Sequence, residues 1–135
     1  MEQDTSRRRY LDELERDLAI CATFEDACSI LQELLTGPFS ATETGEFYEI
    51  KGLVSVTKGV KLTINSKEHA PPHFHVSYGN ENGLLTIADC SLLDGLLSNR
   101  TQNIVYGWWK PNKPLLIQKW NLSRPSDCPV GMYKE

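Results

Sequence analysis

The spacing of apolar residues along the chain changes from a helical period to strand alternation near residue 38. Residues 10–35 place apolar side chains three and four positions apart, whereas residues 60–65 and 73–78 alternate between apolar and polar side chains. A period of 3.6 predicts amphipathic helices, and a period of 2 predicts half-buried strands. We therefore predict an α+β chain, with a helical hairpin at residues 1–37 followed by an α+β domain at residues 38–135.

The predicted hairpin has well-marked helix ends. Thr23 stands at the N-cap of a helix over residues 24–36, and Asp26, three positions later, completes a capping-box pattern. Gly37 and Pro38 end this helix, because glycine tolerates a left-handed cap and proline cannot continue a helix. The default interpretation is that the hairpin packs on the remainder of the chain. Since the apolar stripe of the first helix is narrow, the alternative is a docking surface at residues 1–36 for a protein partner or a second copy.

The predicted domain begins as a small antiparallel sheet and ends in helices that pack on it. Strands are predicted over residues 47–56, 60–65, 73–79 and 84–89, with a hairpin turn at residues 80–83. C-terminal helices are predicted over residues 98–109 and 115–120, because the prolines of the Lys-Pro-Asn-Lys-Pro run between them should break a helix.

The charge distribution, the apolar runs and the cysteine spacing exclude several classes of protein. Residues 1–36 hold nine acidic residues and four arginines, whereas no acidic residue occurs between Asp94 and Asp127. The longest apolar runs are a few residues, and none follows the N-terminal arginines, so we expect no membrane span, no secretory signal and a cytoplasmic location. The cysteines have neither a Cys-x-x-Cys nor a zinc-finger spacing, which favours reduced, mostly buried thiols (Cys21, Cys28, Cys90 and Cys128).

All three histidines lie within seven residues, His69, His73 and His75. In a strand that begins near His73, alternation puts His73, His75 and Ser77 on one face, and Phe74, Val76 and Tyr78 on the core face. Two imidazoles at positions i and i+2 of a strand suit a divalent metal such as zinc. His69, Glu68 or a distant carboxylate such as Asp89 would be the third ligand, and Glu68 and His69 are also candidates for acid–base catalysis.

Other interpretations of these residues stay open. The histidines could brace the Pro-Pro loop through hydrogen bonds, or contact a ligand together with Ser77 and Tyr78 without a metal. The aromatic and basic C-terminal third, with Lys110 and Lys113, could bind nucleic acid. Tryptophans at helical spacing are more often core residues, with lysines near helix ends.

The stretch from Glu68 to Val76, followed by Tyr78 and Gly79, closely resembles the signature of a small bacterial family known as domain of unknown function 4160. The resemblance covers roughly residues 50–121 and continues through Ile87, Leu93-Asp94-Gly95-Leu96, Arg100, Trp108 or Trp109, and Trp120-Asn121. The chain departs from the family pattern at Glu68, where aspartate is usual, at the Lys-Pro-Asn-Lys-Pro run, and by its helical residues 1–36.

The resemblance implies no established activity. Genes of this family often lie beside small partner genes that resemble toxin–antitoxin pairs, which implies a protein partner or a defence role. We therefore expect a cytoplasmic bacterial module that acts through a protein partner. A metal-dependent hydrolase or nuclease that uses His69, His73 and His75 is the alternative, and a nucleic-acid-binding module is the second alternative. The sequence leaves open whether the protein is an enzyme.

Overall fold

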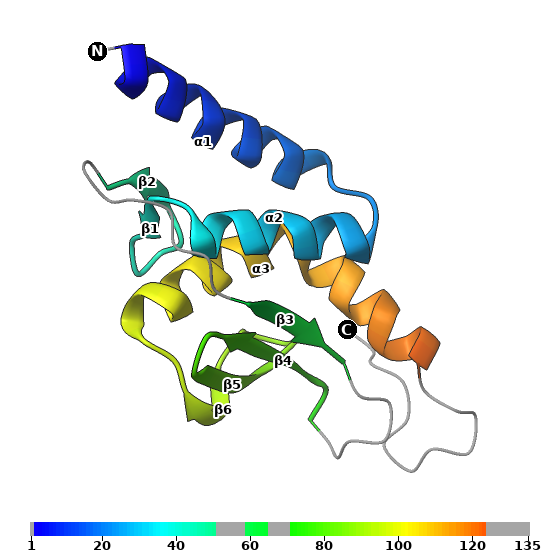
Figure 1. Ribbon diagram of the computed structural model, residues 1–135. Helices are drawn as coiled ribbons and strands as arrows, with labels where there is room; N and C mark the ends of the chain where they lie inside the picture. Colours follow the sequence, from blue (N-terminus) through cyan, green and yellow to red (C-terminus); the bar gives the residue numbers. More distant parts are fainter. Residues whose placement is uncertain (1, 51–58, 65–70, 124–135) are drawn as a thin grey trace.

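The structure is a computed structural model, and it describes residues 2–50, 59–64 and 71–123 (Figure 1). The helices and strands follow in the order α1 (Glu2–Ile20), α2 (Phe24–Thr36), β1 (Phe39–Ala41), β2 (Phe47–Glu49), β3 (Val60–Thr63), β4 (His73–Tyr78), β5 (Glu81–Thr86), β6 (Leu92–Leu96) and α3 (Asn99–Ser123). This arrangement is the predicted α+β fold with an N-terminal helical hairpin. None of the helices in the described ranges is both long and apolar enough to cross a membrane.

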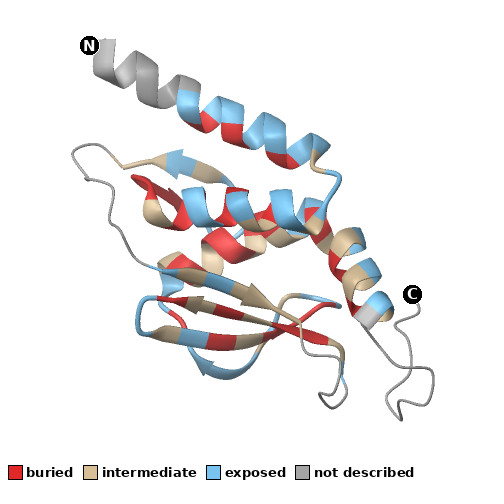
Figure 2. Ribbon diagram, turned by 45° about the vertical axis from the view of Figure 1, so that its right-hand side comes forward, coloured by how far each residue is buried: buried red, intermediate tan, exposed pale blue. Residues whose placement is uncertain are grey.

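The strands form two antiparallel sheets, one of β1 and β2 and one of four strands in the order β3-β4-β5-β6. Helices α2 and α3 lie over one face of the four-stranded sheet, and α1 lies beyond α2 (Figure 1). No described element covers the other face, which we call the open face (Figures 1 and 2). The strand predicted over residues 47–56 is present only as β2, and residues 51–56 lie outside the described ranges.

One hydrophobic core joins the helices to the covered face of the sheet. Phe74 and Val76 of β4 are fully buried, as alternation predicted, and Tyr78 is 6% exposed. Trp108 of α3 packs on Phe74, with ring centroids 6.2 Å apart, and its indole N–H donates to the Ala27 carbonyl of α2 at 2.7 Å. The leucine stripe of α1 is also buried in this core, so both parts of the chain share it (Leu11, Leu14 and Leu18).

Helix α2 begins as predicted and ends differently. The Thr23 hydroxyl accepts a hydrogen bond from the Asp26 N–H at 3.1 Å, which is the N-cap interaction of the predicted capping box. Gly37 ends the helix without the left-handed cap that we predicted, because its φ is −86°. Its role is steric: a Cβ at Gly37 would lie 2.5 Å from the Phe39 ring.

The turn between β4 and β5 is shorter than predicted. Tyr78 pairs with Glu81, so the loop consists of Gly79 and Asn80 alone, and Gly79 adopts a φ of +60°. Two-residue hairpin loops require such a positive φ, which glycine adopts without strain. Residues 81–83, predicted as part of the turn, therefore lie in β5.

The two predicted C-terminal helices are one helix, α3, with Pro111 and Pro114 inside it. Each proline removes a backbone donor, and the two halves of α3 run in different directions (Figure 1). The helix continues because Leu116 and Trp120, beyond the prolines, are fully buried in the core. The buried Asn112 side chain also donates to the Trp108 carbonyl at 2.9 Å, which reinforces the helix between the prolines.

Candidate functional site

Strand register places the side chains of the open face in rows that cross all four strands. One row consists of Thr63, His75, Leu84 and Asp94, which are paired in succession from β3 to β6. The next row consists of Lys61, Ser77, Asn82 and Leu96. Because successive side chains of a strand alternate between faces, and Phe74 and Val76 fill the core, both rows face away from the core.

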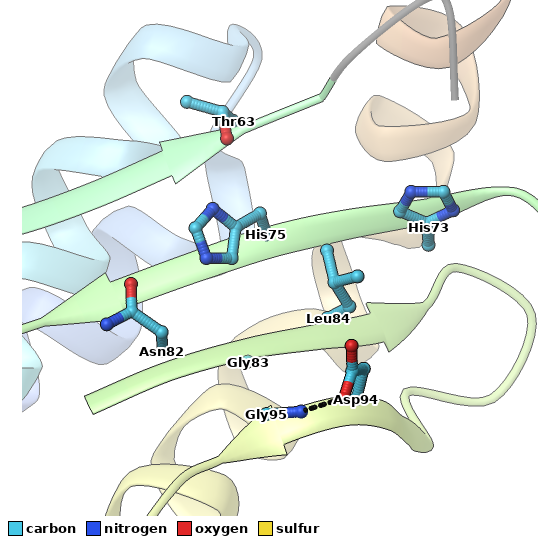
Figure 3. A pocket seen from close by; sticks show the side chains of 8 residues that line it. All are labelled: Thr63, His73, His75, Asn82, Gly83, Leu84, Asp94 and Gly95. Carbon is cyan, nitrogen blue, oxygen red and sulfur yellow. Dashed lines mark hydrogen bonds between the residues drawn. The ribbon is translucent and has the colours of Figure 1, made fainter. Parts of the chain in front are cut away.

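A hollow of about 400 Å³ lies on the open face (Figure 3). It is lined by Thr63, His73, His75, Asn82, Gly83, Leu84, Asp94 and Gly95, which come from all four strands. A second hollow of about 580 Å³ adjoins it and shares Asn82 and Gly95; its other lining residues include Leu96, which is 81% exposed. The first hollow is polar around the histidines, and the second combines the exposed Leu96 with polar residues such as Glu81 and Ser98.

His73 and His75 differ in their surroundings. His73 is 7% exposed, its ring centroid lies 5.7 Å from that of Trp120, and its Nδ1 lies 2.8 Å from the Pro71 carbonyl oxygen. A carbonyl can only accept, so Nδ1 carries the proton and the orientation of the imidazole is fixed. His75 is half-buried and projects into the hollow between β3 and β5 (Figure 3).

Strand β6 was not predicted from the sequence, and it supplies one wall of the hollow. Gly95 adopts a φ of +89°, and a Cβ there would lie 2.2 Å from the Asn82 carbonyl oxygen. The Asp94 carboxylate accepts a hydrogen bond from the Gly95 N–H at 2.8 Å. A register irregularity at Leu84 and Leu85 keeps Asp94 opposite Leu84 on the open face. Glycine at position 95 is therefore required for the shape of this wall.

The structure brings only some of the predicted site residues together. His73 and His75 line the hollow, and Ser77 lies in the adjacent row of the open face. Tyr78 lies on the covered face instead, where it belongs to the core. Glu68 and His69 lie outside the described residues. Within the described ranges, no three side chains of histidine, cysteine, aspartate or glutamate gather where they could hold one metal ion.

The residues that the sequence interpretation missed are Thr63, Asn82, Leu84 and Asp94. The alternation of residues 60–65 had already placed Thr63 on the polar face of its strand. Asn82 was missed because it was predicted to lie in a turn, and Asp94 because residues 92–96 showed no recognised strand pattern. Asp89, a possible metal ligand by sequence, accepts hydrogen bonds from the Thr86 hydroxyl and the Ser91 N–H, which lower the pKa of its carboxyl.

The aromatic and basic residues of α3 have contacts within the chain. Trp108 and Trp120 are core residues, and the Trp109 indole N–H donates to the Ile87 carbonyl at 2.8 Å. Lys110 Nζ lies 4.9 Å from the centre of the Tyr106 ring and donates to the Thr44 carbonyl, and Lys113 Nζ lies 5.8 Å from the centre of the Trp109 ring. Trp108, Trp109 and Lys110 thus link α3 to other parts of the fold, whereas the Lys113 contact lies within α3.

The thiols are poor nucleophile candidates. Burial raises the pKa of Cys28 to about 11 and the pKa of Cys90 to about 12, and it also raises the pKa of Cys21. Because the thiolate is the reactive form, these three thiols are almost fully protonated at neutral pH. Cys128 lies outside the described residues. The chemistry of the candidate site therefore depends on imidazole, amide, hydroxyl and carboxylate groups.

Residues 59–121 match the model of a protein family described as Domain of unknown function (DUF4160). This segment contains β3 to β6 and most of α3, and so the whole candidate site. No curated protein and no solved structure matches the chain. The DUF4160 model therefore matches the segment that carries the candidate site, whereas helices α1 and α2 and the β1–β2 sheet lie outside the match.

Proposed function

We propose that the protein is a binding module for a protein partner and that the open face of the four-stranded sheet is its binding surface. The observation that carries this proposal is the hollow on that face, into which His75, Asn82 and Asp94 project from three strands (Figure 3). Its lining offers hydrogen-bond donors and acceptors beside an exposed leucine in the adjoining hollow. Protein interfaces combine such apolar contacts with polar groups that set specificity.

Two other surfaces are less suited to this role. The apolar stripe of α1 is buried within the chain, so in residues 10–20, where side chains are described, the outer side of α1 is mostly charged, and its exposed large apolar residues are Tyr10 and Ile20. The aromatic rings of α3 that reach the surface, Tyr106 and Trp109, stack on each other with their centres 5.7 Å apart. Lysines lie over these rings, which leaves little ring surface for a nucleic-acid base.

Co-purification from the native host tests the proposal. Tagged wild-type protein is expected to retain a protein partner after nuclease treatment, and the Asn82→Arg variant is expected to lose it, since the arginine would fill the junction of the two hollows. Tyr48→Arg is a matched control, because Tyr48 is 48% exposed on β2, in the other sheet. Loss of the partner on nuclease treatment, or equal retention by all three proteins, would contradict the proposal.

The family resemblance supports a small bacterial partner of the toxin–antitoxin or defence kind, and we include this partner class in the proposal. The product of a neighbouring small gene is then the first protein to look for in the co-purified material. Mass spectrometry of the wild-type eluate, compared with the Asn82→Arg eluate, identifies the protein whose retention depends on the open face.

A metal-dependent hydrolase or nuclease is the second candidate, and the hydrogen bond between His73 Nδ1 and the Pro71 carbonyl favours it. Histidines that ligate metals usually donate their other ring N–H to such a carbonyl. If this candidate is right, wild-type protein retains about one zinc ion per chain after dialysis, and replacement of the half-buried His75 by asparagine weakens zinc binding at least about tenfold. Elemental analysis and titration against a chelating dye measure this. Wild-type protein that retains no zinc would contradict this candidate.

A further inference from the structure

The open face carries two formal charges of opposite sign at its two edges. Of the outward positions that the structure describes on β3 to β6, only Lys61 and Asp94 carry a full charge at neutral pH with histidine neutral. Lys61 is exposed on the edge strand β3, and Asp94 is exposed on the edge strand β6. Hydroxyl, imidazole and amide groups occupy most of the positions between them.

The strand geometry fixes how far apart these charges are. Neighbouring strands are about 4.8 Å apart, so three steps across the sheet amount to roughly 14 Å. Lys61 and Asp94 also lie in adjacent rows, which adds about 7 Å along the strands and gives a separation of roughly 16 Å. A ligand that meets both charges must therefore be extended across all four strands.

From this we infer that the partner contributes an extended segment that crosses the open face, with an acidic side chain at Lys61 and a basic side chain at Asp94. The inference rests on the proposed function. Ser77 and Asn82 lie in the path of this segment and can form hydrogen bonds with its backbone. The N–H and C=O groups of an extended backbone are available for such bonds, whereas those of a helix bond to each other. Side chains an even number of residues apart point to the same side of an extended segment. Four residues span about 14 Å, and the long lysine side chain covers the remaining distance of roughly 2 Å, so the two charges are expected four residues apart.

The Asp94 carboxylate can accept a cation in this position. It accepts one hydrogen bond, from the Gly95 N–H, and a carboxylate has further lone pairs for a lysine or arginine. A second copy of the chain fits less well. If two copies paired through antiparallel β6 strands centred on Asp94, the two Asp94 carboxylates would lie opposite each other. If the pair were centred on Gly95, each Asp94 would lie opposite the apolar Leu96 of the other copy.

Charge variants test the inference on the complex with the co-purified partner. Lys61→Glu is expected to weaken binding about tenfold and Asp94→Asn about fivefold, and raising the salt concentration should weaken wild-type binding. Arg16→Glu and Glu43→Gln make the same charge changes at exposed positions away from the sheet, and are expected to leave affinity unchanged. Asparagine retains the acceptor for the Gly95 N–H, so Asp94→Asn should preserve β6.

A diazirine analogue of leucine at the exposed position 96, which keeps the shape of that side chain, then identifies the contacted segment by mass spectrometry. The inference predicts an acidic and a basic residue four positions apart in the cross-linked peptide, and reversal of the acidic residue should restore binding to the Lys61→Glu variant. If Lys61→Glu and Asp94→Asn both bind the partner with wild-type affinity while Asn82→Arg does not bind it, this inference is wrong and the proposed function stands. Retention of the partner by Asn82→Arg would instead overturn the proposed function.

Discussion

Removal of residues 1–37 is expected to unfold the remaining chain. Helix α2 contributes Leu31, Leu34 and Leu35 to the core, each at most 1% exposed. Burial of such side chains stabilises a protein by about 1.5–3 kcal/mol each, so their loss removes about 5–9 kcal/mol, comparable with the whole stability of a small domain. The truncation also removes the Leu35 and Gly37 carbonyls that accept from the Arg100 guanidinium at 2.9 and 3.3 Å.

Circular dichroism and tryptophan fluorescence of residues 38–135 measure this effect. Two point variants test core packing without shortening the chain. Leu31→Ala is expected to lower the free energy of unfolding by about 2–5 kcal/mol, whereas Ile20→Ala is expected to lower it by less than about 0.5 kcal/mol. Leu31 is fully buried, whereas Ile20 is 77% exposed. A truncated protein with a cooperative unfolding transition would show that these residues fold without α1 and α2.

Gly95→Ala is expected both to destabilise the protein and to abolish partner binding. A Cβ at this position would lie 2.2 Å from the Asn82 carbonyl oxygen, and alanine at a φ of +89° is strained. The strain costs about 1–2 kcal/mol and the overlap about 1–3 kcal/mol, so we expect a loss of about 2–5 kcal/mol. β6 has to shift to relieve the overlap, and this distorts the wall shared by the two hollows.

Gly59→Ala is the matched control, because a Cβ at Gly59 would meet nothing within 4 Å. Its stability is expected to change by less than about 1 kcal/mol, with partner binding intact. Urea denaturation followed by tryptophan fluorescence compares the two variants. Equal stability of Gly95→Ala and wild-type protein would show that β6 does not have the described backbone conformation.

The elements that could be predicted from the sequence are those whose signals are local. The cap at Thr23 and the alternation of residues 73–78 act within one element, and both are confirmed. The break predicted at Pro111 and Pro114 was wrong because burial of Leu116 and Trp120 outweighs the lost backbone hydrogen bonds. That burial depends on residues far away in the chain, which periodicity does not reveal.

The candidate site shows the same division. His73 and His75 are recognisable because three histidines cluster in the sequence. Asp94 and Thr63 join them only through strand pairing, since a residue of β6 and a residue of β3 lie in one row with His75. The two-residue turn at Gly79 and Asn80 sets the register of β5 on β4, and the conformation of Gly95 allows β6 to pair with β5. Neither effect is visible as a hydrophobic pattern.

Methyl NMR spectra of the complex with the co-purified partner test the central claim most directly, since they report which surface is covered. Leu84 and Leu96 lie on the open face, Leu85 lies in the core at 1% exposure, and Ile20 lies on the outer side of α1. If the open face binds the partner, the Leu84 and Leu96 methyl signals shift on binding, and the Leu85 and Ile20 signals stay in place. Shifts at Ile20 with unchanged Leu84 and Leu96 signals would instead locate the partner on α1 and contradict the account.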